Sequence, residues 1–183
     1  MPSQLFESEL IRLDSMDAER DAEIESRWTH DPAYARLLSA DPMRPRSPNQ
    51  VKKRYEEMEK KENEYHFAIR ARADDRLVGF IRLGHLEWTN GNAVLTFGIG
   101  DAADRGKGYG KEAVRLMLRY AFGELNLYRL TANVPGNNER AQRVLERAGF
   151  CVEARRREAI HRDGQRWDAL VMGLLRDEWK ETR

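Results

Sequence analysis

Three glycines alternate with basic and aromatic residues in the segment Arg105-Gly106-Lys107-Gly108-Tyr109-Gly110-Lys111. Glycine allows tight turns and lets an anion approach main-chain N–H groups, and the N-terminus of a following helix adds about half a positive charge. The side chains of Arg105, Lys107 and Lys111 add charge of the same sign. The segment therefore predicts a loop that binds a diphosphate.

Residue spacing argues against two common nucleotide-binding motifs. A Walker A loop requires Ser or Thr after its Gly-Lys pair, but Glu112 follows Lys111. A dinucleotide fingerprint placed on 98–103 would put Asp101 where a pyrophosphate must lie.

Two ordered motifs resemble those of the GNAT superfamily of N-acetyltransferases. Segment 105–110, Arg-x-x-Gly-x-Gly, is similar to the family's acyl-CoA pyrophosphate loop. Segment 138–150 opens with Asn-x-x-Ala and closes on Gly-Phe, like the family's later helix. The resemblance extends from 10–13 to 178–179, and the last stretch is similar to the branch of ribosomal-protein N-terminal and spermidine acetyltransferases.

This resemblance implies one N-acetyltransferase domain over 1–183, with acetyl-CoA as cosubstrate, no metal, and direct attack by a primary amine in a ternary complex. In the family, the pantetheine arm pairs with the strand before the glycine loop, and an Asn of the later helix reaches the cofactor. The implied cofactor-binding residues are Phe97, Gly98, Ile99, Arg105, Gly106, Lys107, Gly108, Tyr109, Gly110, Lys111 and Asn138.

Acetyl transfer also needs a base, because a free alkyl amine has a pKa of about 10.4 and must lose a proton. Members of the branch often carry a Glu on the strand before the loop, whereas 94–96 here are Val, Leu and Thr. Glu87 is the expected substitute, since its apolar neighbours Leu86 and Trp88 should raise its pKa; the alternative is an ordinary solvated carboxylate of a loop. His85 and Asp101 are the next candidates.

The thiolate leaving group is protonated in many relatives by a Tyr or Ser of the later helix. The matching positions here are Leu145 and Ala141, which cannot donate a proton. A thiol has a pKa of about 8.5, so departure without a dedicated acid is compatible with activity.

Hydrophobic periodicity predicts the elements that position these residues. Strands are expected at 9–13, 65–70, 77–83, 93–99, 127–134, 150–160 and 167–175. Helices are expected after the capping residues 14–17 to about 28, and at 49–63, 106–123 and 138–148. The Pro-rich segment 41–48 predicts a loop long enough to border a site, and Asp163-Gly164 predicts a hairpin turn. This order predicts an α/β fold, with a mixed, mostly antiparallel sheet flanked by helices.

Composition limits the classes of partner. The 183 residues carry a net charge of +1, which gives no global field for nucleic acid or an anionic membrane. The absence of a long apolar run and the single cysteine predict a cytoplasmic protein, with Cys151 as a buried structural residue. The four Trp and the resemblance favour a homodimer.

Two alternatives to an enzyme stay open at this level. The missing strand Glu and helix hydroxyl suit a non-catalytic domain of the same fold that binds or senses acyl-CoA. Scattered arginines are the only feature that suits a binding module for protein or RNA.

Overall fold

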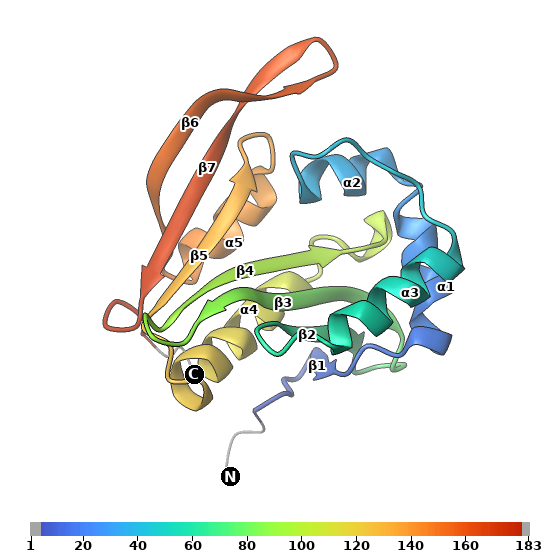
Figure 1. Ribbon diagram of the computed structural model, residues 1–183, viewed down its shortest axis with the longest axis horizontal. Coiled ribbons are helices and arrows are strands. Elements are labelled where there is room, and N and C mark those ends of the chain that lie inside the picture. The colour runs from blue at the N-terminus through green and yellow to red at the C-terminus, as the bar shows by residue number, and fades with distance from the viewer. Residues whose placement is uncertain (1–4, 181–183) are drawn as a thin grey trace.

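One seven-stranded sheet runs through the computed structural model, which describes residues 5–180 (Figure 1). The strands are β1 (Ile11–Asp14), β2 (Tyr65–Ala71), β3 (Leu77–Glu87), β4 (Asn92–Ile99), β5 (Arg129–Pro135), β6 (Cys151–Arg162) and β7 (Gln165–Leu175), in the order β1-β2-β3-β4-β5-β7-β6. The helices are α1 (Ala18–Trp28), α2 (Pro32–Leu38), α3 (Pro48–Glu59), α4 (Tyr109–Arg119) and α5 (Glu139–Arg147), with a 3-10 turn η1 (Ala102–Asp104) and a π-helical turn η2 (Tyr120–Glu124). The expected mixed α/β fold is confirmed.

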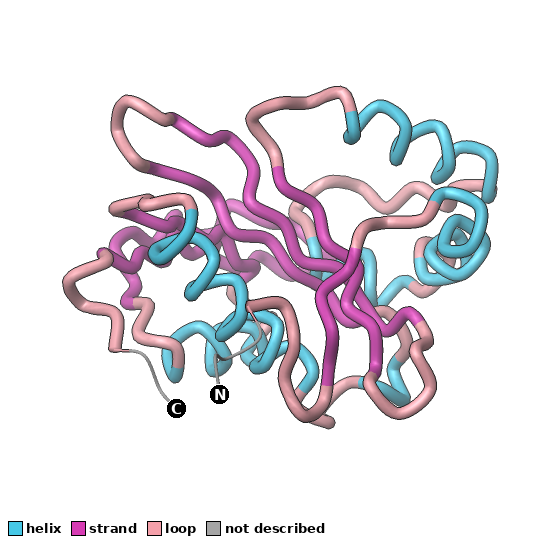
Figure 2. Tube along the Cα trace, turned by 90° about the horizontal axis from the view of Figure 1, so that it is seen from below, coloured by secondary structure: helices cyan, strands magenta, loops and turns pink. Residues whose placement is uncertain are grey.

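Helices lie on both sides of the sheet (Figure 2). Because successive side chains of a strand point to opposite faces, Ala68 and Phe80 pack with α1 and α2, whereas Ile69 and Ile81 join the main core under α4. The strongest expected helix, α4, buries its apolar face in that core, as its periodicity predicts. None of the helices among the described residues is long and apolar enough to cross a membrane.

The parallel pair β4–β5 is the exception in an otherwise antiparallel sheet. The two strands pair only from Asn92–Val94 to Arg129–Thr131 and then separate. Beyond Val94, β4 keeps β3 as a partner on one side, while its other edge has no strand beside it. The sheet therefore opens in its middle.

Several element boundaries differ from the expected ones. Helix α2 was not expected, although Asp31 caps it by accepting from the N–H of Ala33 at 2.9 Å and Pro32 occupies its first turn. Gly123 does not end the α4 segment, which continues through η2 and reaches a positive φ at Asn126 instead. The expected hairpin turn at 163–164 is confirmed, with positive φ at both residues.

Cys151 is exposed, so the expectation of a buried structural cysteine is wrong. The apolar run Phe150-Cys151-Val152 suggested burial, but β6 is one of the two edge strands of the sheet and residues 151–159 are exposed. Phe150, which precedes the strand, is the residue of that run that enters the core.

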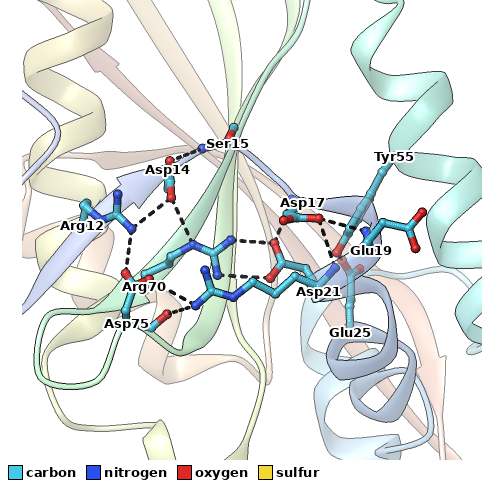
Figure 3. A network of polar contacts seen from close by, with 11 residues as sticks. Arg12, Asp14, Ser15, Asp17, Glu19, Asp21, Glu25, Tyr55, Arg70 and Asp75 are labelled. Atoms are coloured by element: carbon cyan, nitrogen blue, oxygen red, sulfur yellow. Dashed lines mark hydrogen bonds and ion pairs between the residues drawn. The ribbon is translucent and has the colours of Figure 1, made fainter.

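A buried ion pair fastens α1 to the sheet (Figure 3). Arg70 of β2 is 1% exposed and donates to both carboxylate oxygens of Asp21 on α1, at 3.1 and 2.9 Å. Its Nε also donates to Asp14 of β1 at 3.2 Å. Since Asp21 is fully buried, each charge depends on the other for solvation.

Replacing Asp21 by Asn should lower the free energy of unfolding by about 3–5 kcal/mol, because it leaves the Arg70 charge buried with Asp14 alone. Urea denaturation followed by circular dichroism measures this. Glu19→Gln, also on α1, removes an exposed ion pair to Lys52 of α3 and should change the midpoint little. Equal effects of the two substitutions would show that the buried pair does not fasten the helix.

Candidate active site

A groove of about 520 Å³ follows the opening between β4 and β5, and we call it the glycine-loop groove. Main chain and side chains of β4, β5, α2, α5 and the glycine loop line it. Of the expected cofactor-binding residues, it is lined by Phe97, Gly98, Ile99, Arg105, Gly106, Gly108, Gly110, Lys111 and Asn138. Lys107 and Tyr109 do not line it.

The glycine loop presents main chain to the groove. Gly106 and Gly108 have φ of 84° and 93°, a region that side-chain-bearing residues rarely adopt. Helix α4 begins after Gly108 without a side-chain cap, so N–H groups of its first turn have no capping partner. A helix N-terminus of this kind suits a diphosphate.

Two of the three basic side chains of the loop, those of Arg105 and Lys107, are held by carboxylates. Arg105 donates to Asp31 at 2.9 Å and to the carbonyl oxygen of Gly100 at 2.6 Å, so it fastens the loop to the start of α2. Lys107 pairs with Asp104 at 3.0 Å. Hydrogen bonds from Arg76 and Lys107 lower the pKa of Asp104 to about 2, which keeps it ionised. The main chain, more than these cations, is therefore the feature available to a diphosphate.

Asn138 lines the groove and also has two structural contacts. Its Oδ1 accepts from the N–H of Ala141 at 3.1 Å, which caps α5, and its Nδ2 donates to the carbonyl oxygen of Leu37 at 2.9 Å. Ala141 and Leu145 line the groove as expected, so α5 offers no hydroxyl at those positions.

Three arginines and a tyrosine are among the groove residues that were not predicted from the sequence. Arg140, Arg143 and Arg147 of α5 line the groove, and their spacing of three and four was a readable signal of one helix face. Tyr34 of α2 lines it too, and its buried hydroxyl has no hydrogen-bond partner. An unpartnered donor, positive-φ glycines and a cationic helix face together suit a large anionic ligand such as CoA.

A second cavity, of about 480 Å³, lies on the side of the sheet that α1 and α3 cover, and we call it the histidine cavity after His66 and His85 in its lining. It shares Leu38, Thr96, Asn133, Val134 and Pro135 with the glycine-loop groove. The two spaces therefore meet where β4 and β5 separate. The expected Pro-rich loop 41–48 does not line this cavity, although Ser39 and Ala40 just before it do.

His66 lies in an in-register row with Arg82 and Thr96 across β2, β3 and β4. Its Nε2 is 2.8 Å from Oε2 of Glu64, which itself accepts from Lys61 at 3.0 Å. Burial lowers the pKa of His66, against the opposing effect of the Glu64 carboxylate. The imidazole is therefore neutral at neutral pH and held in one orientation.

The structure does not bring Glu87 to either cavity. Glu87 lies at the exposed end of β3, where it accepts from the side-chain amides of Asn90 at 3.0 Å and Asn92 at 3.3 Å. These hydrogen bonds lower its pKa, so the expected rise is wrong. Desolvation acts in the expected direction but is outweighed, because Leu86 is buried in the core and Trp88 is 51% exposed and packs against Tyr65.

The two other candidates for the base, His85 and Asp101, lie in different surroundings. His85 lines the histidine cavity and takes a positive φ of 51° at an irregularity in the β3–β4 pairing. Asp101 is exposed and lines neither cavity.

Comparison with known proteins agrees with this geometry. Residues 11–151 match the Acetyltransferase (GNAT) domain family. The chain is 41% identical over 124 residues to the probable N-acetyltransferase YjcK of Bacillus subtilis, covering 66% of this chain and 67% of that protein. It is 34% identical over 107 residues to the putative ribosomal N-acetyltransferase YdaF of the same organism, covering 58% of each.

A solved structure has the same fold. The spermidine N-acetyltransferase of Vibrio cholerae in complex with CoA and spermine superposes with a TM-score of 0.82 at 19% identity, covering 92% of this chain and 96% of that one. With a family match over most of its length, this chain belongs to the GNAT acetyltransferases, which transfer the acetyl group of acetyl-CoA to an amine.

Proposed function

We propose that the glycine-loop groove holds acetyl-CoA, that the histidine cavity holds a primary amine, and that the amine attacks the acetyl group directly where the two spaces meet. The observation that carries this is the set of five lining residues common to both, among them Thr96 and Asn133. Acetyl-CoA supplies the activated acyl group. The free edge of β4 from Phe97 to Ile99 supplies main-chain groups beside it.

His66 is the proton acceptor in this proposal. With its Nε2–H donated to Glu64, the lone pair of Nδ1 is free to take a proton from the amine. His66 and Thr96 are two strands apart, roughly 10 Å at the usual strand spacing, so the proton passes through water. A neutral imidazole can take that proton at neutral pH, whereas an ammonium of ordinary pKa cannot release it unaided.

Assembly and location belong to the same proposal. We infer one domain over the whole chain, acting as a cytoplasmic homodimer. The open outer edge of β6 and the exposed Trp88 support association, and a single exposed cysteine fits a reducing compartment.

Gly108→Val should weaken CoA binding far more than Lys107→Ala. A β-branched residue is strained at φ 93° and its side chain blocks the approach of a phosphate, whereas Lys107 is already paired with Asp104. Isothermal titration with CoA measures both. Gly123→Ala, where an added Cβ meets nothing within 4 Å, is the folding control and should bind as the wild type does. A harmless Gly108→Val would rule out the loop as the diphosphate site.

Asn138→Ala should raise KM for acetyl-CoA and nearly keep kcat, because an amide neither takes nor gives a proton at neutral pH. Loss of the α5 cap should also lower stability by about 1 kcal/mol. Asn138→Ser keeps a capping oxygen but cannot reach Leu37, so it separates the two effects. A fall in kcat with unchanged KM would contradict the binding role.

His66→Gln should lower kcat/KM by ~10²–10⁴ with CoA affinity unchanged, because it removes basicity and keeps polarity. Thiol release from acetyl-CoA with a panel of primary amines measures this, and the deficit should shrink as pH rises and more amine arrives neutral. In the wild type, activity should fall on acidification only below pH 6.5, the ordinary value from which the pKa of His66 is lowered. His161→Gln, on exposed β6, is the matched control.

Two results would contradict the role of His66 or the proposed activity. If His85→Gln carries the loss and His66→Gln does not, His85 is the proton acceptor. If CoA binds but no amine releases thiol, the chain is a non-catalytic acyl-CoA-binding domain.

A further inference from the structure

We propose that the amine acetylated by this enzyme also carries an anionic group, a carboxylate or a phosphate, which Arg82 and Arg156 bind in the histidine cavity. This inference rests on the proposed acceptor role of that cavity. Neither the family nor the relatives determine the charge of the acceptor amine.

The carboxylates that line the histidine cavity are both occupied. Glu25 of α1 is 4% exposed, and it accepts from Arg54 and from the hydroxyl of Tyr55 on α3. Glu64 accepts from His66 and from Lys61. Among the described residues, the lining therefore offers no unpaired carboxylate to a second ammonium group of a polyamine.

The cations of the cavity are in excess. Arg54, Arg82 and Arg156 all line it, and no carboxylate of the described residues lies within ion-pairing distance of Arg82 or Arg156. Arg54 is paired with Glu25 through one amino group, but its Nε is buried without a hydrogen-bond partner. Guanidinium groups lacking acceptors in a partly enclosed space favour a ligand that brings oxygen acceptors and negative charge.

Strand register places these arginines around the reaction point. Arg82 is half-buried and lies between His66 and Thr96 in their row across the sheet. Arg156 is exposed on β6, in register with Ala169 of β7 and so with Pro135 of β5, which lines both spaces. A short amine whose anionic group binds Arg82 would thus lie where the two spaces meet. Arg156 would contact the same anionic group from β6.

Arginine also favours the reaction of such a substrate. A planar guanidinium binds a carboxylate or phosphate through two parallel hydrogen bonds, which fixes orientation as well as distance. The charge of Arg82 contributes to the lowered pKa of His66, and it acts in the same direction on an ammonium bound nearby. A polyamine would meet the same charge as repulsion.

Matched amines test the inference. γ-Aminobutyrate, butylamine and putrescine share a four-carbon chain and differ in the far end, which is anionic, apolar or cationic, and ethanolamine phosphate against ethanolamine separates phosphate from carboxylate. With the wild-type enzyme, kcat/KM should be at least ~10-fold higher for one of the acid-bearing amines than for its partner without the acid.

Arg82→Met should remove most of that preference by lowering the rate with the acid-bearing amine and leaving or raising the rate with butylamine, while Arg82→Lys should keep part of it. Arg155→Met is the matched control. Arg155 neighbours Arg156 on β6 but pairs with Asp168 at 2.8 Å and lines neither cavity, so its ratio should equal that of the wild type.

The outcomes separate the two proposals. If butylamine, putrescine or an uncharged peptide amide is acetylated as well as the acid-bearing amines, the inference about charge is wrong and the acetyltransferase proposal stands. If an acid-bearing amine is preferred but Arg82→Met keeps the preference, the site of recognition is wrong. If no amine releases thiol, the proposed function fails, and with it this inference.

Discussion

The separation of β4 from β5 is the constraint on which the site depends. A parallel pair buried in the middle of a sheet would normally satisfy its main-chain groups along its whole length, but here pairing ends at Val94. The groups left free on β4 need a partner, and the opening connects the two faces of the sheet. One local break in hydrogen bonding thus creates the glycine-loop groove and its connection to the histidine cavity.

Buried charged groups position the helices that line the histidine cavity. Arg70 fixes Asp21 and therefore α1 against β2, and α1 carries Glu25 one turn later. Glu25 in turn holds Arg54 and Tyr55 of α3. This chain of buried polar contacts crosses from the sheet through two helices to the cavity lining. A substitution of Arg70 would therefore change the position of α1 and, through Glu25, the position of Arg54.

The glycine loop can be located from the sequence because the features that form it are local. Short segments of sequence contain each of its features: the glycines with positive φ, the start of a helix, and the Asn that caps the next helix. The histidine cavity was missed because its walls come from segments far apart in the chain, joined only by register. His66, Arg82 and Thr96 become neighbours through two antiparallel pairings, which no local spacing encodes. The missed helix α2 differs from this case, because its local signal, an Asp cap followed by Pro, is present in the sequence.

Glu87 shows why a local argument predicted the wrong direction for a pKa shift. Leu86 is buried, and Trp88 lies beyond the end of β3. Glu87 itself accepts from the side-chain amides of Asn90 in the following turn and of Asn92 at the start of β4. A carboxylate would in any case be a poor proton acceptor in the histidine cavity, because nearby arginines lower its pKa and weaken its basicity. An imidazole responds differently to the same surroundings: burial and Arg82 keep His66 neutral, which is the form that accepts a proton. The lowered pKa of His66 is therefore a consequence first of burial and second of the neighbouring arginine charge.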